Sequence, residues 1–147
     1  MSLQETIDRD FKEAMRARDD IRLSVLRMIK TAAKNKQVEL RRPLEEDDLL
    51  GVLTSQAKQR RDSIDQFTSG GRADLAAREE AELGIIEAYL PKQLSRTEME
   101  EAVAAMVVEL EAKSVKDMGR VMKVLMSRYK GRMDGKAAGD LVKEKLS

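Results

Sequence analysis

The side chains able to do chemistry in this sequence are carboxylates, lysines, arginines, hydroxyl-bearing residues and two tyrosines, because the chain has no histidine and no cysteine. Histidine is the commonest general base near neutral pH and the commonest metal ligand. Cysteine would be needed for disulfides, thiolate metal sites and thiol nucleophiles. The composition therefore predicts no metal site and no cofactor, and it removes most routes to an activated nucleophile.

The remaining candidates for catalysis have simpler structural explanations. Glu45-Glu46-Asp47-Asp48 has the residue types of a metal site, but neighbouring residues on a helix do not face one another, and these acids suit the positive end of a helix dipole. Gly70-Gly71-Arg72 lacks the strand and the lysine of a phosphate loop, so a helix cap explains it better. Ser55, Ser63 and Ser127 have no histidine partner. We therefore expect no catalytic residue that acts within this chain alone.

Basic side chains gather in the last third of the chain. The segment 113–136 contains eight lysines and arginines and only two acids. Lys116, Arg120 and Lys123 are three or four residues apart, so we predict that they share one helix face. Such a stripe could contact phosphates, because lysine and arginine that neutralise phosphates gain affinity through counterion release. On charge alone, a solvated helix face is the commoner explanation.

Two other basic stretches lie earlier in the sequence. Residues 16–42 contain nine lysines and arginines against three acids, and Lys58-Gln59-Arg60-Arg61 forms a shorter run. No aromatic side chains interleave with either, so stacking on nucleic-acid bases is not suggested.

The elements that would position these residues are helices. Aromatic residues make up only 3% of the chain, so the core must consist of Leu, Ile, Val, Ala and Met, which helices accommodate better than sheets. Capping boxes at Ser2-x-x-Glu5, Ser95-x-x-Glu98 and Ser114-x-x-Asp117 predict helix starts. An apolar stripe of Leu3, Ile7, Phe11 and Met15 follows the first of them. The whole pattern predicts helices near residues 2–18, 19–40, 45–69, 72–90, 95–110, 114–130 and 134–146.

The sequence predicts an all-α fold with a boundary at Pro91. We expect a four-helix N-terminal domain over residues 1–91 and a small three-helix tail domain over residues 92–147. Gly70-Gly71, Pro91 and Gly131 interrupt the pattern too often for the alternative, a long coiled coil. The first residues show no signal-peptide pattern, and the longest apolar run, 102–108, is too short to span a membrane. We expect a cytoplasmic protein.

Both expected domains resemble a known family. In the N-terminal part, the stretches 58–64 and 71–83 and the sequence Tyr89-Leu90-Pro91 resemble the YqeY proteins. Asp117-Met118-Gly119-Arg120-Val121-Met122-Lys123, followed by Lys130-Gly131-Arg132-Met133-Asp134, resembles the tail domain that YqeY proteins share with the GatB subunit of tRNA-dependent amidotransferases.

The resemblance implies an all-helical protein with a tail of the type associated in GatB with gripping tRNA. The family is often described by the amidotransferase reaction, a carbon–nitrogen ligation that uses glutamine as amide donor. This chain lacks the Gly/Ser-rich amidase signature and the cradle domain of that system. The resemblance therefore implies a tRNA-binding or tRNA-associated accessory module, which an aminoacyl-tRNA-related enzyme would accompany.

The residues expected to contact tRNA all belong to the tail. We predict that basic side chains contact backbone phosphates and that two glycines permit close approach; the set is Lys116, Gly119, Arg120, Lys123, Lys130, Gly131, Arg132 and Lys136. Packing and capping would also explain the two glycines. Two alternatives stay open: a protein-interaction adaptor that uses exposed faces of the N-terminal helices, and an amidotransferase that acts alone.

Overall fold

The computed structural model describes all 147 residues, and every regular element in it is a helix. The elements are α1 (Leu3–Ala17), α2 (Asp20–Leu40), α3 (Glu46–Ser69), α4 (Ala73–Glu87), α5 (Arg96–Glu109), the 3-10 helix η1 (Val115–Asp117), α6 (Met118–Arg128) and α7 (Gly135–Leu146). The all-helical fold is confirmed. None of these helices combines the length and the apolar character that a membrane crossing requires.

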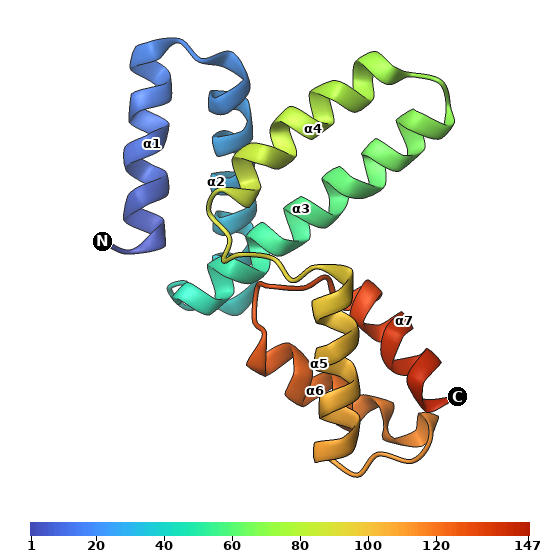
Figure 1. The fold of residues 1–147 in the computed structure, drawn as a ribbon. Coiled ribbons are helices and arrows are strands. Elements are labelled where there is room, and N and C mark those ends of the chain that lie inside the picture. Colours follow the sequence, from blue (N-terminus) through green and yellow to red (C-terminus); the bar gives the residue numbers. More distant parts are fainter. The chain divides into compact units, whose positions relative to one another are not determined.

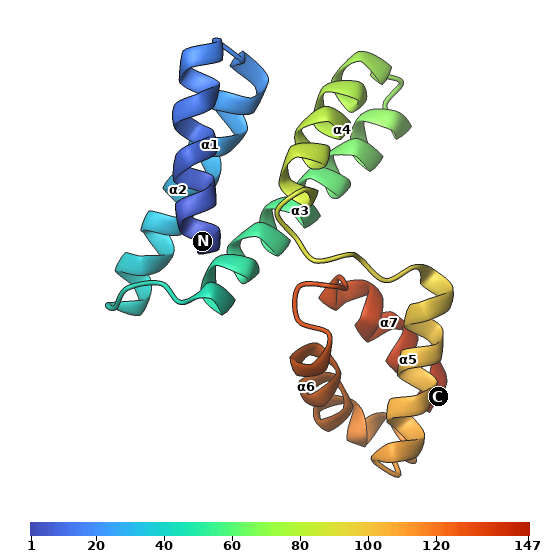
Figure 2. The same cartoon turned by 60° about the vertical axis from the view of Figure 1, so that its left-hand side comes forward.

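The contacts divide the chain into two compact units, Met1–Leu90 and Pro91–Ser147, which we call unit 1 and unit 2. Unit 1 contains α1 to α4, and unit 2 contains α5, η1, α6 and α7. Figures 1 and 2 show that α1 and α2 form one antiparallel hairpin, and that α3 and α4 form a second. Within unit 1, α2 packs against both α3 and α4.

Each unit has its own hydrophobic core. In unit 1 the core includes Ile7 and Ala14 of α1, Val25, Leu26 and Ile29 of α2, Leu49, Leu53 and Ala57 of α3, and Ile86 of α4. In unit 2 it includes Met99, Val103 and Met106 of α5, Val121 and Leu125 of α6, Met133, and Ala138, Leu141, Val142 and Leu146 of α7. Aliphatic side chains and methionines make up both cores, as the low aromatic content requires.

Local hydrogen bonds fix most helix starts where the sequence places them. Ser2 accepts from the backbone N–H of Glu5, and Asp19 accepts from that of Arg22. Complete capping boxes join Ser95 to Glu98 at α5 and Glu45 to Asp48 at α3. The acids at the start of α3 thus have specific structural partners: Glu46 accepts from the backbone N–H of Leu3 at 2.7 Å, and Asp48 pairs with Arg42 at 2.6 Å.

Three details differ from the sequence prediction. The fourth helix ends at Glu87 and not near Leu90. The backbone N–H groups of residues 89 and 90 donate to the carbonyl oxygens three residues earlier, and not four as in an α-helix. Met15 is 46% exposed and Ala14 is buried in its place, since a spacing of four drifts around a helix of 3.6 residues per turn. Ser114 accepts from the backbone N–H of Lys116 and begins η1, so the third capping box does not start an α-helix.

Candidate nucleic-acid interface

The predicted contact residues occupy η1, α6, the following turn and the start of α7, all in unit 2. Lys116 lies in η1, whereas Gly119, Arg120 and Lys123 lie in α6. The spacing of three and four residues predicted one shared helix face. Lys116 instead lies outside the regular α-helix that carries Arg120 and Lys123. Because α6 has 11 residues and a helix rises ~1.5 Å per residue, about 16 Å of helix separates Lys116 from the turn at 130–132, and Lys123 lies within that length. The set forms an elongated surface and not a single cluster.

The two arginines of the set have structural partners within unit 2. Arg120 donates to the carbonyl oxygen of Leu110 at 2.8 Å and pairs with Asp117 at 3.4 Å. The Nε of Arg132 donates to the carbonyl oxygen of Lys92 at 3.0 Å. Both arginines therefore hold backbone segments together, and only their remaining N–H groups could reach a ligand.

The lysines of the set lie at the surface. Lys116, Lys123, Lys130 and Lys136 are all exposed. The side chains of Lys116, Lys123 and Lys136 make no hydrogen bond or ion pair within the chain. A flexible, exposed ammonium group suits a phosphate better than an arginine that is already bonded to a carbonyl.

The acids near this surface are largely engaged. The backbone N–H of Lys113 donates to Asp117 at 2.9 Å and, as the largest cause, lowers the pKa of its carboxyl. Asp134 caps α7 by accepting from the backbone N–H of Ala137. Arg128, which the predicted set leaves out, makes a two-bond pair with Glu109 at 2.8 and 3.1 Å, and this pairing lowers the pKa of Glu109.

The two glycines of the set have different explanations. Gly131 is buried with φ of 73°, a left-handed conformation that side chains rarely adopt, and its carbonyl accepts from the side chain of Gln93 at 2.6 Å. Gly119 lies exposed in the first turn of α6, and a Cβ atom there would meet nothing within 4 Å. Turn geometry accounts for Gly131, whereas no contact within the chain requires a glycine at 119.

The sequence analysis missed the segment that holds the 130–132 turn. Leu94 donates its backbone N–H to the carbonyl of Arg132 at 2.8 Å, alongside the bonds from Gln93 to Gly131 and from Arg132 to Lys92. We call this set of three bonds the 92–94 clasp. The partners in these bonds are 38 to 40 residues apart in sequence. No local sequence pattern predicts hydrogen bonds over such a separation.

A second polar cluster, in unit 1, shows no geometry suited to catalysis. Asp10 is 7% exposed and accepts from the hydroxyl of Tyr89 at 2.6 Å, with Arg22 at 3.6 Å and Arg9 at 3.3 Å. Burial, followed by the bond to Asp10, raises the pKa of Tyr89 to about 12. A tyrosine that holds its proton so firmly is a hydrogen-bond donor and not a base. No group of three acids that could hold a metal ion is present in the chain.

Comparisons with known proteins show the family to which this chain belongs. The family model described as "Yqey-like protein" matches residues 4–146. "Altered inheritance of mitochondria protein 41, mitochondrial" of Lachancea thermotolerans is 34% identical over 108 residues, which cover 71% of this chain and 58% of that protein. The proteins of the same name in Eremothecium gossypii and Saccharomyces cerevisiae are 36% identical over 85 residues and 35% identical over 82 residues. Those alignments cover 57% and 55% of this chain.

The chain spans about half the length of these relatives, between 44% and 58%. Their names place these relatives in mitochondria, and the expected cytoplasmic location stays a prediction for this chain. The match to the family model extends over both units and includes every residue of the candidate interface. This chain therefore belongs to the family of YqeY-like proteins.

Proposed function

We propose that this chain is an accessory module that holds tRNA, with unit 2 as a tail domain that contacts backbone phosphates and unit 1 as the N-terminal domain of the same protein. The resemblance of the segment 117–134 to the GatB tail supports tRNA as the ligand. In this proposal an enzyme of aminoacyl-tRNA metabolism carries out the chemistry, including any amide transfer from glutamine.

One observation carries the proposal: Gly119 is exposed with open space around its Cα, and it lies in sequence between two exposed, unpaired lysines. Lys123 lies four residues after it on α6, so the two are neighbours on that helix, and Lys116 lies three residues before it in η1. A glycine without a side chain lets a phosphate approach the helix backbone closely, and the positive end of the α6 dipole favours the negative charge. Lys130 and Lys136 extend this surface beyond the far end of α6.

The test is a titration with bulk tRNA at salt concentrations between about 50 and 200 mM. Replacing Lys116 and Lys123 together with alanine should weaken binding and reduce the slope of log affinity against log salt by about 1.5, because each lost phosphate contact removes ~0.7 to 0.9. The matched control replaces Lys143 and Lys145, two exposed lysines at the end of α7, and should leave the slope unchanged. Equal slopes for the first variant and the unmodified protein would refute this use of Lys116 and Lys123.

A further inference from the structure

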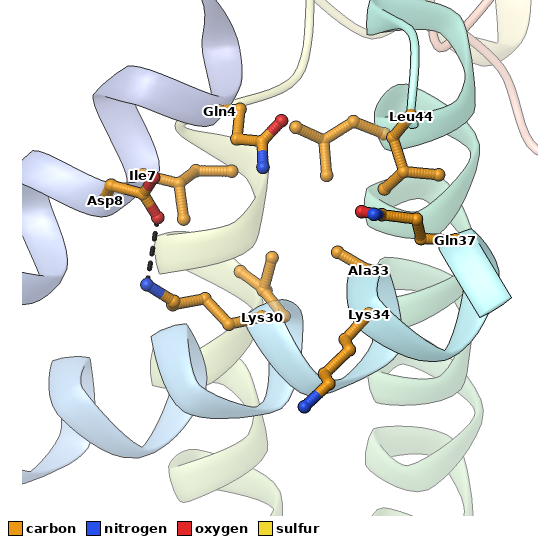
Figure 3. A pocket seen from close by; sticks show the side chains of 10 residues that line it. Gln4, Ile7, Asp8, Lys30, Ala33, Lys34, Gln37 and Leu44 are labelled. Atoms are coloured by element: carbon orange, nitrogen blue, oxygen red, sulfur yellow. Dashed lines mark hydrogen bonds and ion pairs between the residues drawn. The ribbon is translucent and has the colours of Figure 1, made fainter. Parts of the chain in front are cut away.

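The basic stretch at residues 16–42 has no part in the proposed tRNA surface, and its second half borders a hollow in unit 1. The hollow has a volume of about 110 Å³ and lies between α1, α2 and the start of α3. Figure 3 shows Ile7, Ala33 and Leu44 around it, with the pair of Asp8 and Lys30 at one edge. Ile29 and Leu49, which are almost fully buried, complete its apolar wall.

The size of this hollow limits what can occupy it. Sites for drug-sized ligands measure ~300 to 1,000 Å³, and one water molecule occupies ~30 Å³ in the liquid. A space of about 110 Å³ therefore accommodates a single aliphatic side chain and not a nucleotide or a cofactor. Pockets that accept one anchoring side chain are typical of protein–protein contacts.

A second hollow continues this surface along α2. It has a volume of about 360 Å³ and shares Lys34 and Gln37 with the first. Val38, which is 70% exposed, and Pro43 give it apolar area at the surface. We call the combined surface, formed by the two hollows and the part of α2 between Lys30 and Arg41, the α2 surface.

The charge of the α2 surface is positive. Lys30 pairs with Asp8 at 2.9 Å, and Arg42 pairs with Asp48 at 2.6 Å, so these two cations are neutralised within unit 1. Lys34 and Arg41 are exposed and have no acidic partner. Both line the second hollow, Lys34 from α2 and Arg41 from the position directly after α2, where the backbone is left-handed with φ of 55°.

We propose that the α2 surface docks an acidic, amphipathic segment of a protein partner, which inserts one aliphatic side chain into the hollow of Figure 3 and places carboxylates against Lys34 and Arg41. The apolar wall and the exposed Val38 favour a protein over a nucleic acid, because a phosphate backbone gains nothing from an aliphatic hollow. Phe11, the aromatic ring nearest this region on α1, is covered by the Lys30 ammonium at 4.7 Å and offers no stacking platform. This inference concerns unit 1 and goes beyond the proposed tRNA contact.

Three synthetic helical peptides of about three turns provide the probes. The first carries glutamates and one leucine anchor, the second replaces the glutamates with lysines, and the third replaces the leucine with serine. Each is titrated into the ¹⁵N-labelled chain of 147 residues. The acidic leucine peptide should shift the amide signals of residues 29, 33, 37 and 49, whereas the other two should not. Added salt should weaken the binding, because exposed ion pairs contribute to it.

Protein variants make the test sharper. Lys34→Glu with Arg41→Glu should weaken binding of the acidic peptide by about tenfold, because two attractions become repulsions. Lys143→Glu with Lys145→Glu makes the same charge change in unit 2 and should leave binding unchanged. Ala33→Leu should fill the hollow and abolish binding; if this variant unfolds, the charge-reversal pair still decides the question.

Three results would overturn the proposal. The first is that titration with the acidic leucine peptide leaves the amide signals of residues 29, 33, 37 and 49 unshifted. A single-stranded RNA oligonucleotide that shifts those signals instead would assign the surface to nucleic acid. Shifts that appear on concentrating the protein alone would assign it to a second copy of this chain. The tRNA titration with the Lys116 and Lys123 variant is independent of all three.

Discussion

At the scale of single residues, Gly119 and Gly131 show how one residue type can have two different causes. Gly131 adopts φ of 73° in a buried turn and bonds to Gln93, so its own conformation requires glycine. Gly119 is helical, exposed and free of neighbours. A glycine in a helix costs up to ~1 kcal/mol relative to alanine, and nothing within the chain offsets this cost at residue 119.

Substitution of Gly119 should therefore separate stability from binding. Gly119→Gln should raise the free energy of unfolding by about 0.5 kcal/mol, because glutamine has the higher helix propensity. The same change should weaken tRNA binding, because the new side chain covers the helix backbone between Lys116 and Lys123. Urea unfolding and the bulk tRNA titration measure the two effects.

Gly84 of α4 provides the matched control for this substitution. It is also helical and exposed, and a Cβ atom there would meet nothing within 4 Å. Gly84→Gln should give a similar gain in stability with no change in tRNA affinity. Weaker tRNA binding by both variants would show that Gly119 has no special part in the interface.

At the scale of elements, the pairing of Tyr89 with Asp10 connects the turn after α4 to the middle of α1. Tyr89→Phe should lower the free energy of unfolding by about 1 kcal/mol, because it removes a donor from a carboxylate that is largely buried. Tyr129→Phe is the control, since no hydrogen bond from the Tyr129 hydroxyl is present. Equal stability losses in the two variants would contradict a specific role for Tyr89.

The burial of Tyr89, together with its bond to Asp10, should give unit 1 an alkaline pH dependence. The pKa of Tyr89 is raised from 10.0 to about 12 in the folded state, so the folded state binds this proton more tightly than the unfolded state. The stabilisation is complete below pH 10 and is lost as the pH rises toward about 12. Lysines also titrate in this range, so the difference between the unmodified protein and Tyr89→Phe is the quantity to measure.

The elements that the sequence predicts well are those fixed by neighbours in the chain. Ser95 with Glu98 and Asp134 with Ala137 are three residues apart, and such short-range caps can be read directly from residue types. The bond between Tyr89 and Asp10 joins residues 79 apart, and only the folded helices bring them together. The helices that carry the basic residues could be predicted from such local patterns. The bonds from Arg120 to a carbonyl oxygen and from Arg128 to Glu109 could not, because their partners are distant in sequence.

At the scale of the whole molecule, each unit has a separate hydrophobic core, so each has the main requirement for folding alone. A fragment of residues 91–147 should fold and show helical circular dichroism with a cooperative thermal transition. A fragment of residues 95–147 keeps the Ser95 cap but lacks the 92–94 clasp, and it should be less stable by about 2 to 3 kcal/mol, since three hydrogen bonds of ~1 kcal/mol are lost. Equal melting temperatures would show that the clasp is dispensable for unit 2.

The placement of the two tyrosines gives the molecule a native optical readout. The chain has no tryptophan, and Tyr89 belongs to unit 1 whereas Tyr129 belongs to unit 2, so each unit contains a single tyrosine. We expect the carboxylate of Asp10, at 2.6 Å from the Tyr89 hydroxyl, to quench the emission of Tyr89 by accepting its hydrogen bond, and unfolding of unit 1 to relieve that quenching. With Tyr129→Phe, the remaining emission reports on unit 1 alone, and with Tyr89→Phe it reports on unit 2, without any attached dye.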